Sequence, residues 1–225
     1  MEKKNNLRQV LTMILFGAIW GLLEATVGYL LHWLPSMVTG FVMFPIGAAL
    51  MMWGFRSTDE RKAILVAGLV AAAIKVVNFA LPLPGNDIMR VLNPMISIIL
   101  QSIIVFGFSF LFERKTTPMK ATFVQLGVIV AAIVGWRMLF LVNQAVNYAI
   151  TGVLAAQIQN FANAMDFVFL KGAYELLILV FFYGLYRLGK FVLWKQPIRL
   201  TSPDWLIYIL SPLTLAGAVF AVVLL

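Results

Sequence analysis

Long apolar segments separated by short charged connections limit what this chain can fold into more than any other feature. A helix of about 20 apolar residues crosses the roughly 30 Å hydrocarbon core of a bilayer. Helices also pair their own backbone N–H and C=O groups, as lipid requires. Apolar runs lie at about residues 10–31, 37–55, 63–83, 91–112, 121–148, 165–188 and 205–225. The sequence therefore predicts an all-α, polytopic transmembrane helix bundle of six to seven spanning helices, forming a single integral membrane domain over residues 1–225.

The composition agrees with this interpretation. Hydrophobic residues make up 62% of the 225 residues and charged residues 12%, a balance typical of a polytopic membrane protein. The net charge of +8 does not indicate a nucleic-acid-binding face, because the basic residues are scattered over the connections. The chain has no cysteine, which excludes disulfides, cysteine-ligated metals and thiol chemistry. We expect no cofactor, no metal and no nucleic-acid partner.

The positive charges predict the orientation of the bundle, since Lys and Arg are enriched in cytoplasmic loops. We therefore expect a cytoplasmic N-terminus and a multi-pass protein of a bacterial or archaeal inner (plasma) membrane. Residues 151–163 mix Gln and Asn with apolar side chains, which predicts an interfacial helix or a lid. Thirteen of the seventeen basic residues lie on alternate connections: Lys3, Lys4, Arg8, Arg56, Arg61, Lys62, Arg114, Lys115, Lys120, Arg187, Lys190, Lys195 and Arg199.

Polar residues inside the apolar segments predict a binding site. Charges within a membrane span are costly and are functional by default. On the predicted topology most of these residues fall in the outer half of the bundle, whereas the cytoplasmic halves are almost purely apolar. This asymmetry describes a cup open to the outside rather than a conduction path. The predicted substrate-binding residues are Glu24, Lys75, Asn78, Arg137, Gln144, Asn147, Lys171 and Glu175.

The mixed charge of this cup indicates a small, polar ligand that is zwitterionic or anionic. The bases would hold its negative group, the amides would fix its orientation, and Trp20, Trp136 and Tyr174 are available to stack on a ring. The bases in question are Lys75, Arg137 and Lys171, and the amides are Asn78, Gln144 and Asn147, with Asn93 also in the outer half; the fifth apolar run becomes polar at its end, where Asn143 also lies.

A purely structural interpretation of the same charges stays open. Lys171 and Glu175 are four residues apart and would neutralise each other on one helix. Glu24 would pair with either Arg137 or Lys75.

The first apolar run carries small residues on one stripe. Gly17, Gly21 and Ala25 fall near one face at 3.6 residues per turn, with Glu24 beside them. Small residues four apart let two helix backbones approach closely. This stripe is expected either to bind a partner helix or to pack helices within the chain.

The small-residue first helix, the cytoplasmic N-terminus, the six or so very apolar helices and the polar outer cup together resemble the substrate-binding S component of energy-coupling factor (ECF) transporters. The resemblance extends to about Leu188 and implies a subunit that captures a vitamin-like molecule from outside and has no enzymatic activity. It implies as partners a coupling transmembrane protein and two cytoplasmic ATPases, with Gly17, Gly21 and Ala25 at the contact. The metal-specific relatives use an N-terminal histidine, which Met1-Glu2-Lys3 does not offer.

A membrane enzyme and a structural or assembly subunit are the two alternatives to this function. Gly107-Phe-Ser109 matches the G-x-S pattern of intramembrane serine proteases, but Ser109 and His32 fall at opposite ends of the membrane and cannot form a nucleophile and base pair. A carboxylate-based membrane enzyme is the less favoured alternative. The second alternative is a structural or assembly subunit of a larger membrane complex. Its intramembrane charges would lie on the outer wall, whereas those of an uptake subunit would lie inside the bundle.

Overall fold

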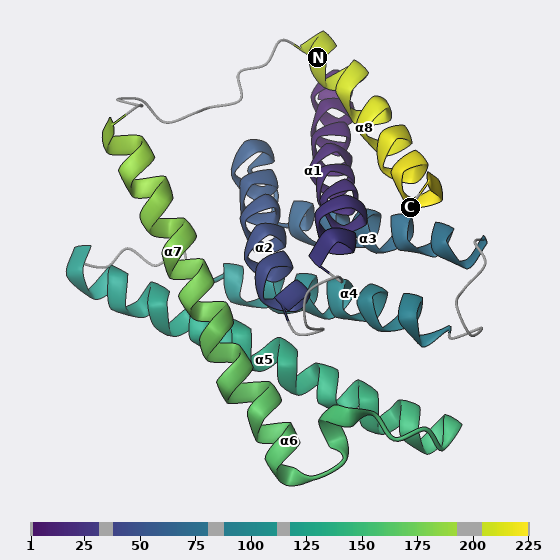
Figure 1. Cartoon of the computed structure of the whole chain (residues 1–225). Coiled ribbons are helices and arrows are strands. Elements are labelled where there is room, and N and C mark those ends of the chain that lie inside the picture. The colour runs from purple at the N-terminus through teal and green to yellow at the C-terminus, as the bar shows by residue number, and fades with distance from the viewer. Residues whose placement is uncertain (1, 32–37, 81–87, 112–117, 193–203, 225) are drawn as a thin grey trace.

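The computed structural model describes residues 2–31, 38–80, 88–111, 118–192 and 204–224 (Figure 1). Over these residues the chain forms helices and no strand, so the all-α prediction is confirmed. The helices are α1 (Glu2–Leu31), α2 (Val38–Thr58), α3 (Lys62–Val76), α4 (Met89–Ser109), α5 (Pro118–Thr151), α6 (Phe161–Met165), α7 (Lys171–Val192) and α8 (Asp204–Leu224). Shorter elements are the 3-10 helices η1 (Val77–Ala80) and η3 (Ala156–Ile158) and the π-helix η4 (Asp166–Leu170).

Four stretches of the described chain are long and apolar enough to cross a membrane: Asn6–Val27, Val91–Ser109, Leu126–Thr151 and Phe161–Leu185. This number is smaller than the six to seven crossings that the sequence predicts. The helices expected at 37–55, 63–83 and 205–225 are present, but α3 is an α-helix of only 15 residues and α2 ends on the polar Arg56, Ser57 and Thr58. In α8 the described stretch Ile209–Val219 is apolar as well.

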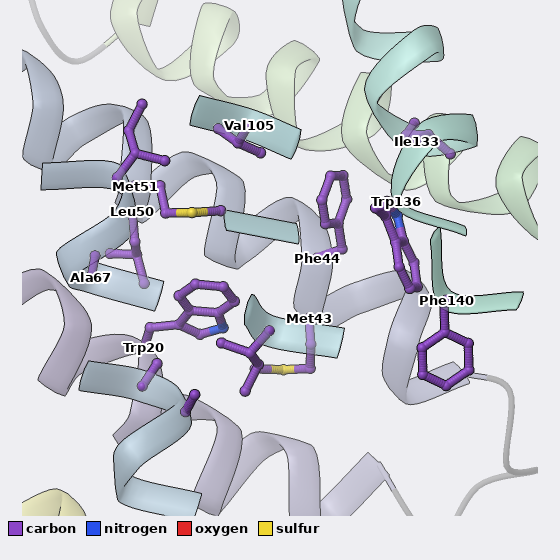
Figure 2. Packing of buried hydrophobic residues seen from close by; sticks show 14 of the residues in the cluster. Trp20, Met43, Phe44, Leu50, Met51, Ala67, Val105, Ile133, Trp136 and Phe140 are labelled. Atoms are coloured by element: carbon purple, nitrogen blue, oxygen red, sulfur yellow. The ribbon is translucent and has the colours of Figure 1, made fainter. Parts of the chain in front are cut away.

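Small residues explain how the first four helices pack. In α3 the buried face is built from Ala63, Ala67, Gly68, Ala71 and Ala72, which lets α1 and α4 approach its backbone. A Cβ at Gly68 would lie 2.3 Å from the Cβ of Ser102 on α4, so only glycine fits there. Larger side chains of α1 and α2 fill the remaining space (Figure 2).

Helix α8 lies beside α1 and runs in the same direction (Figure 1). Near its start the Ser211 hydroxyl donates a hydrogen bond of 2.8 Å to the Leu11 carbonyl. Further along, Ala218 is fully buried in a cluster with Ala25 and Ile74. Two parallel helices at the ends of a membrane chain are what an odd number of crossings produces.

Helices α5 and α7 cross each other and form the other side of the molecule, where α7 also contacts α2 (Figure 1). Gly152 ends α5 with a φ of 72°, a left-handed conformation that glycine adopts without strain. The segment predicted as an interfacial helix or lid then forms only η3 and the five-residue α6. The Asn160 side chain caps α6 by accepting a hydrogen bond from the Asn163 backbone N–H.

Candidate functional site

Arg137 of α5 and Glu175 of α7 form a fully buried ion pair. Their side chains are 1% and 0% exposed, and Arg137 Nε lies 2.9 Å from Glu175 Oε2. Arg137 Nη2 donates to the same oxygen and to the Lys171 carbonyl at 3.4 Å, and Nη1 donates to the Phe167 carbonyl at 2.8 Å. Trp136 Nε1 donates to Glu175 Oε1 at 3.2 Å. Burial of both charges is tolerable because their hydrogen-bonding groups are occupied.

The π-helix η4 makes the Phe167 carbonyl available to this pair. The Lys171 backbone N–H donates to the Asp166 carbonyl, five residues back, rather than to Phe167 as an α-helix would require. The Phe167 carbonyl points to Arg137 and accepts its hydrogen bond there. The wider turn thus supplies an acceptor that a regular helix would use internally.

Aromatic rings surround the guanidinium of Arg137. Its Cζ lies 4.8 Å from the centroid of the Trp136 ring and 4.9 Å from that of Phe167. Trp136 stacks on Phe44 of α2 at 5.8 Å, and Phe140 lies beside it on α5, as Figure 2 shows. Such rings favour a cation over their faces and exclude water from it. Arg137 therefore joins α5, α7 and η4 as part of the core.

Lys171 pairs with Asp166 at 3.3 Å, so the expected ion pair with Glu175 is wrong. The physical reason is the π-turn, which brings residues five apart onto one face and places Asp166 next to Lys171. Glu175 instead faces Arg137. Lys171 remains partly accessible, with 14% of its side chain exposed.

A second buried pair links α1 to α3. Glu24 and Lys75 are 7% and 8% exposed, and Lys75 Nζ lies 3.8 Å from Glu24 Oε1. Of the two partners that the sequence left open for Glu24, the structure selects Lys75. The separation is longer than a hydrogen bond, so the attraction between the two groups is mainly coulombic.

Amide side chains gather on α5 beyond the arginine. Gln144 is buried and its Nε2 donates to Asn93 Oδ1 of α4 at 3.0 Å. Asn147 lies near Gln144 on the inner face of α5, as does Asn143. The Nδ2 atoms of both asparagines are buried and have no hydrogen-bond partner among the described residues. The side chain of Asn78, another predicted site residue, lies outside the part of the chain that the structure describes.

The predicted site residues thus form three groups: the Arg137–Glu175 pair with its surroundings, the Glu24–Lys75 pair, and the amides Gln144 and Asn147. No hydrogen bond or ion pair joins one group to another among the described residues. The sequence missed the partners Asp166 and Trp136 Nε1 and the Phe167 carbonyl. The position of Trp136 next to Arg137 in the sequence was a signal that could have predicted its contact with the pair. No feature of the sequence predicted the π-turn.

The small-residue stripe of α1 is packed inside the chain. A Cβ on Gly17 would lie 2.7 Å from the Ala67 carbonyl oxygen, and one on Gly21 would lie 2.3 Å from Ile74 Cδ1. Ala25 is 6% exposed against α3 and α8. The expectation that these three residues contact a partner protein is therefore corrected, because helices of the same chain already occupy this face. Internal packing was the other interpretation of the stripe.

The Ser109 hydroxyl donates to the Phe106 carbonyl of its own helix at 2.7 Å, and the serine is fully buried. His32 lies outside the described residues. Within the described ranges, no group of three His, Asp or Glu side chains is arranged to hold a metal ion.

No known protein family and no curated protein matches this chain, and no solved structure is similar to it. Its function must therefore be argued from its own residues.

Proposed function

We propose that this chain is the substrate-binding membrane subunit of an ECF-type uptake transporter. It captures a small polar, vitamin-like molecule at the outer side of the cell membrane and passes it to a coupling module driven by cytoplasmic ATPases. The sequence resemblance to ECF S components supports this proposal, and four apolar helices able to span a membrane agree with a multi-pass protein. The subunit has no enzymatic activity of its own.

One observation carries the proposal: the intramembrane charges lie inside the bundle. Glu24, Lys75, Arg137 and Glu175 are all less than 10% exposed, although α5 and α7 have large lipid-accessible faces. An assembly subunit that pairs its charges with another chain would place them on its outer wall. Buried polar groups among membrane helices instead mark a site for a ligand or an ion.

The pairing of these charges changes the role of Arg137. Its guanidinium is held by Glu175 and two carbonyl groups, so it positions α5 against α7 rather than anchoring the ligand. The polar groups that we assign to the ligand are Lys171, which is partly accessible beside the more exposed Asp166, and the amides of α5. A small polar molecule with little net charge fits this set best.

A structural or assembly subunit is the second candidate. The observation in its favour is the apolar face of α7, where Leu177, Val180, Phe181 and Tyr183 are all at least half exposed. Lipid or a neighbouring membrane helix would cover this face equally well, so it does not outweigh the buried charges.

Native mass spectrometry of the protein in mild detergent, alone and co-expressed with candidate coupling subunits, tests the proposal. We expect a retained small molecule whose occupancy falls in Lys171→Gln and is unchanged in Lys62→Gln, which alters an exposed lysine paired with Glu60. A stable partner protein without any retained ligand would favour the assembly subunit.

A further inference from the structure

Two asparagines of α5 hold hydrogen-bond donors for which the described part of the chain provides no acceptor. The Nδ2 atoms of Asn143 and Asn147 are buried without an acceptor. The comparable amides of Gln144 and Asn163 are bonded, to Asn93 Oδ1 at 3.0 Å and to the Ala156 carbonyl at 2.9 Å. Buried amide groups are nearly always hydrogen-bonded, so two orphan donors call for an explanation.

The two donors belong to one surface. Residues four apart on a helix are neighbours on the same face, so Asn143 and Asn147 lie one above the other. The same stripe of α5 continues toward the core as Trp136 and Phe140, which Figure 2 shows side by side. Those rings are buried against Phe167 and close the inner end of the stripe. Asn143 and Asn147 are partly exposed as residues, although their Nδ2 atoms are covered, so a small molecule reaches these donors when the amide groups rotate toward the exposed part of the side chains.

The described residues around these donors carry no unpaired charge. Residues 138–165 include no Lys, Arg, Asp or Glu, and Arg137 and Lys171 are paired with Glu175 and Asp166. A carboxylate placed here would lose its hydration without a cation to compensate. A neutral carbonyl oxygen has two lone pairs that can accept from two N–H donors at a much smaller cost of desolvation.

We propose that Asn143 and Asn147 form a binding site for the neutral carbonyl oxygen of a small ligand. The inference deepens and rests on the proposed function, because it assigns to that ligand the group by which α5 recognises it. It also replaces the expected zwitterionic or anionic ligand with an uncharged one on this side of the bundle.

NMR of the full chain in lipid nanodiscs, with the asparagine side-chain amides labelled with nitrogen-15, tests this site directly. The probes are N,N-dimethylacetamide, which has a neutral carbonyl oxygen and no donor, and acetate, which is charged. We expect dimethylacetamide to shift the Asn143 and Asn147 amide signals saturably, and acetate to shift them far less. The signal of Asn163 serves as an internal control and stays in place.

Two variants make the result specific. Asn143→Leu with Asn147→Leu keeps the branched shape of the side chain and removes both orphan donors, so the fold is retained and the affinity for dimethylacetamide falls by about tenfold or more. Asn147→Asp, a smaller change, replaces a donor by an acceptor and lowers the affinity similarly, while Asn163→Ala has no effect. An absent or non-saturable shift, equal shifts with acetate, or unchanged affinity in the variants would each overturn the proposal.

The same variants separate this site from the proposed function. If mass spectrometry detects a retained ligand whose occupancy does not change in the double leucine variant, the amide site is wrong and the uptake function stands. If dimethylacetamide binds through the asparagines but no ligand or coupling partner is ever retained, the site stands and the uptake function is wrong.

Discussion

At the scale of single residues, the Arg137–Glu175 pair is the most deeply buried ion pair of the described residues. Two charges are removed from water and lipid together, and nearly every hydrogen-bonding group on them is occupied by α5, α7 or η4. Removing one partner leaves the other charged and buried, whereas removing both leaves an apolar gap.

We therefore expect Arg137→Leu and Glu175→Leu each to destabilise the protein by about 3–5 kcal/mol, and the double variant to be less destabilised than the sum of the two. Thermal unfolding in detergent, analysed as a double-mutant cycle, measures this coupling. Lys62→Ala, which breaks an exposed pair with Glu60, is the control and should change stability by less than about 1 kcal/mol. Additive effects of the two leucine substitutions would show that the pair is not coupled.

At the scale of the helices, close approach of α1 to α3 depends on glycine. The backbone carbonyl oxygen of Ala67 lies only 2.7 Å from where a Cβ of residue 17 would be, and a backbone atom cannot move aside as a side chain can. The interhelical distance is therefore set by Gly17 on one helix and by alanines on the other.

Gly17→Ala should push α1 away from α3 and destabilise the protein by about 1–3 kcal/mol, although alanine is the better helix former. Gly107→Ala is the matched control, because Gly107 also lies within a helix and nothing is within 4 Å of its added Cβ. Unfolding temperatures of the two variants in the same detergent decide the question. A loss in Gly107→Ala as large as in Gly17→Ala would rule out close packing as the cause.

At the scale of the whole molecule, the first and last helices lie side by side, because α8 runs alongside α1 in the same direction (Figure 1). The absence of native cysteine makes this arrangement easy to test. We expect Ala25→Cys with Ala218→Cys to be joined by a short bifunctional thiol reagent in membranes, because both residues belong to one buried cluster. Ala25→Cys with Leu213→Cys is the control, since Leu213 is 66% exposed, and cross-linking of both pairs to the same extent would contradict the arrangement.

The number of crossings is also a property of the whole molecule. If α2 and α3 cross the membrane, Ser57 at the end of α2 lies on the cytoplasmic side, and if only the four long apolar stretches cross, it lies outside. We expect a Ser57→Cys variant to react with a membrane-impermeant maleimide only after the cells are opened. Asn160→Cys should react in intact cells under either topology, so it verifies that the reagent has access. Labelling of Ser57→Cys in intact cells would favour four crossings.

The sequence by itself determined the class of fold and the inventory of polar residues. Hydrophobic runs such as 91–112 and 121–148 exceed what a soluble helix needs, and a membrane leaves the helix as the only solution for them. The sequence also identified Arg137, Glu175, Glu24 and Lys75 as residues that could not face lipid. These conclusions depend on local composition, which is visible along the chain.

Only the tertiary structure decided how these residues are paired. Glu24 pairs with Lys75, and Lys171 pairs with Asp166. Gly17 and Gly21 pack against α3 rather than against a partner protein. These outcomes depend on the rotation of each helix about its axis and on the extra residue in the π-turn of η4. Neither leaves a trace in hydrophobic periodicity, because the helices of a membrane bundle are apolar on nearly every face and their contacts are set by the fit of neighbouring side chains.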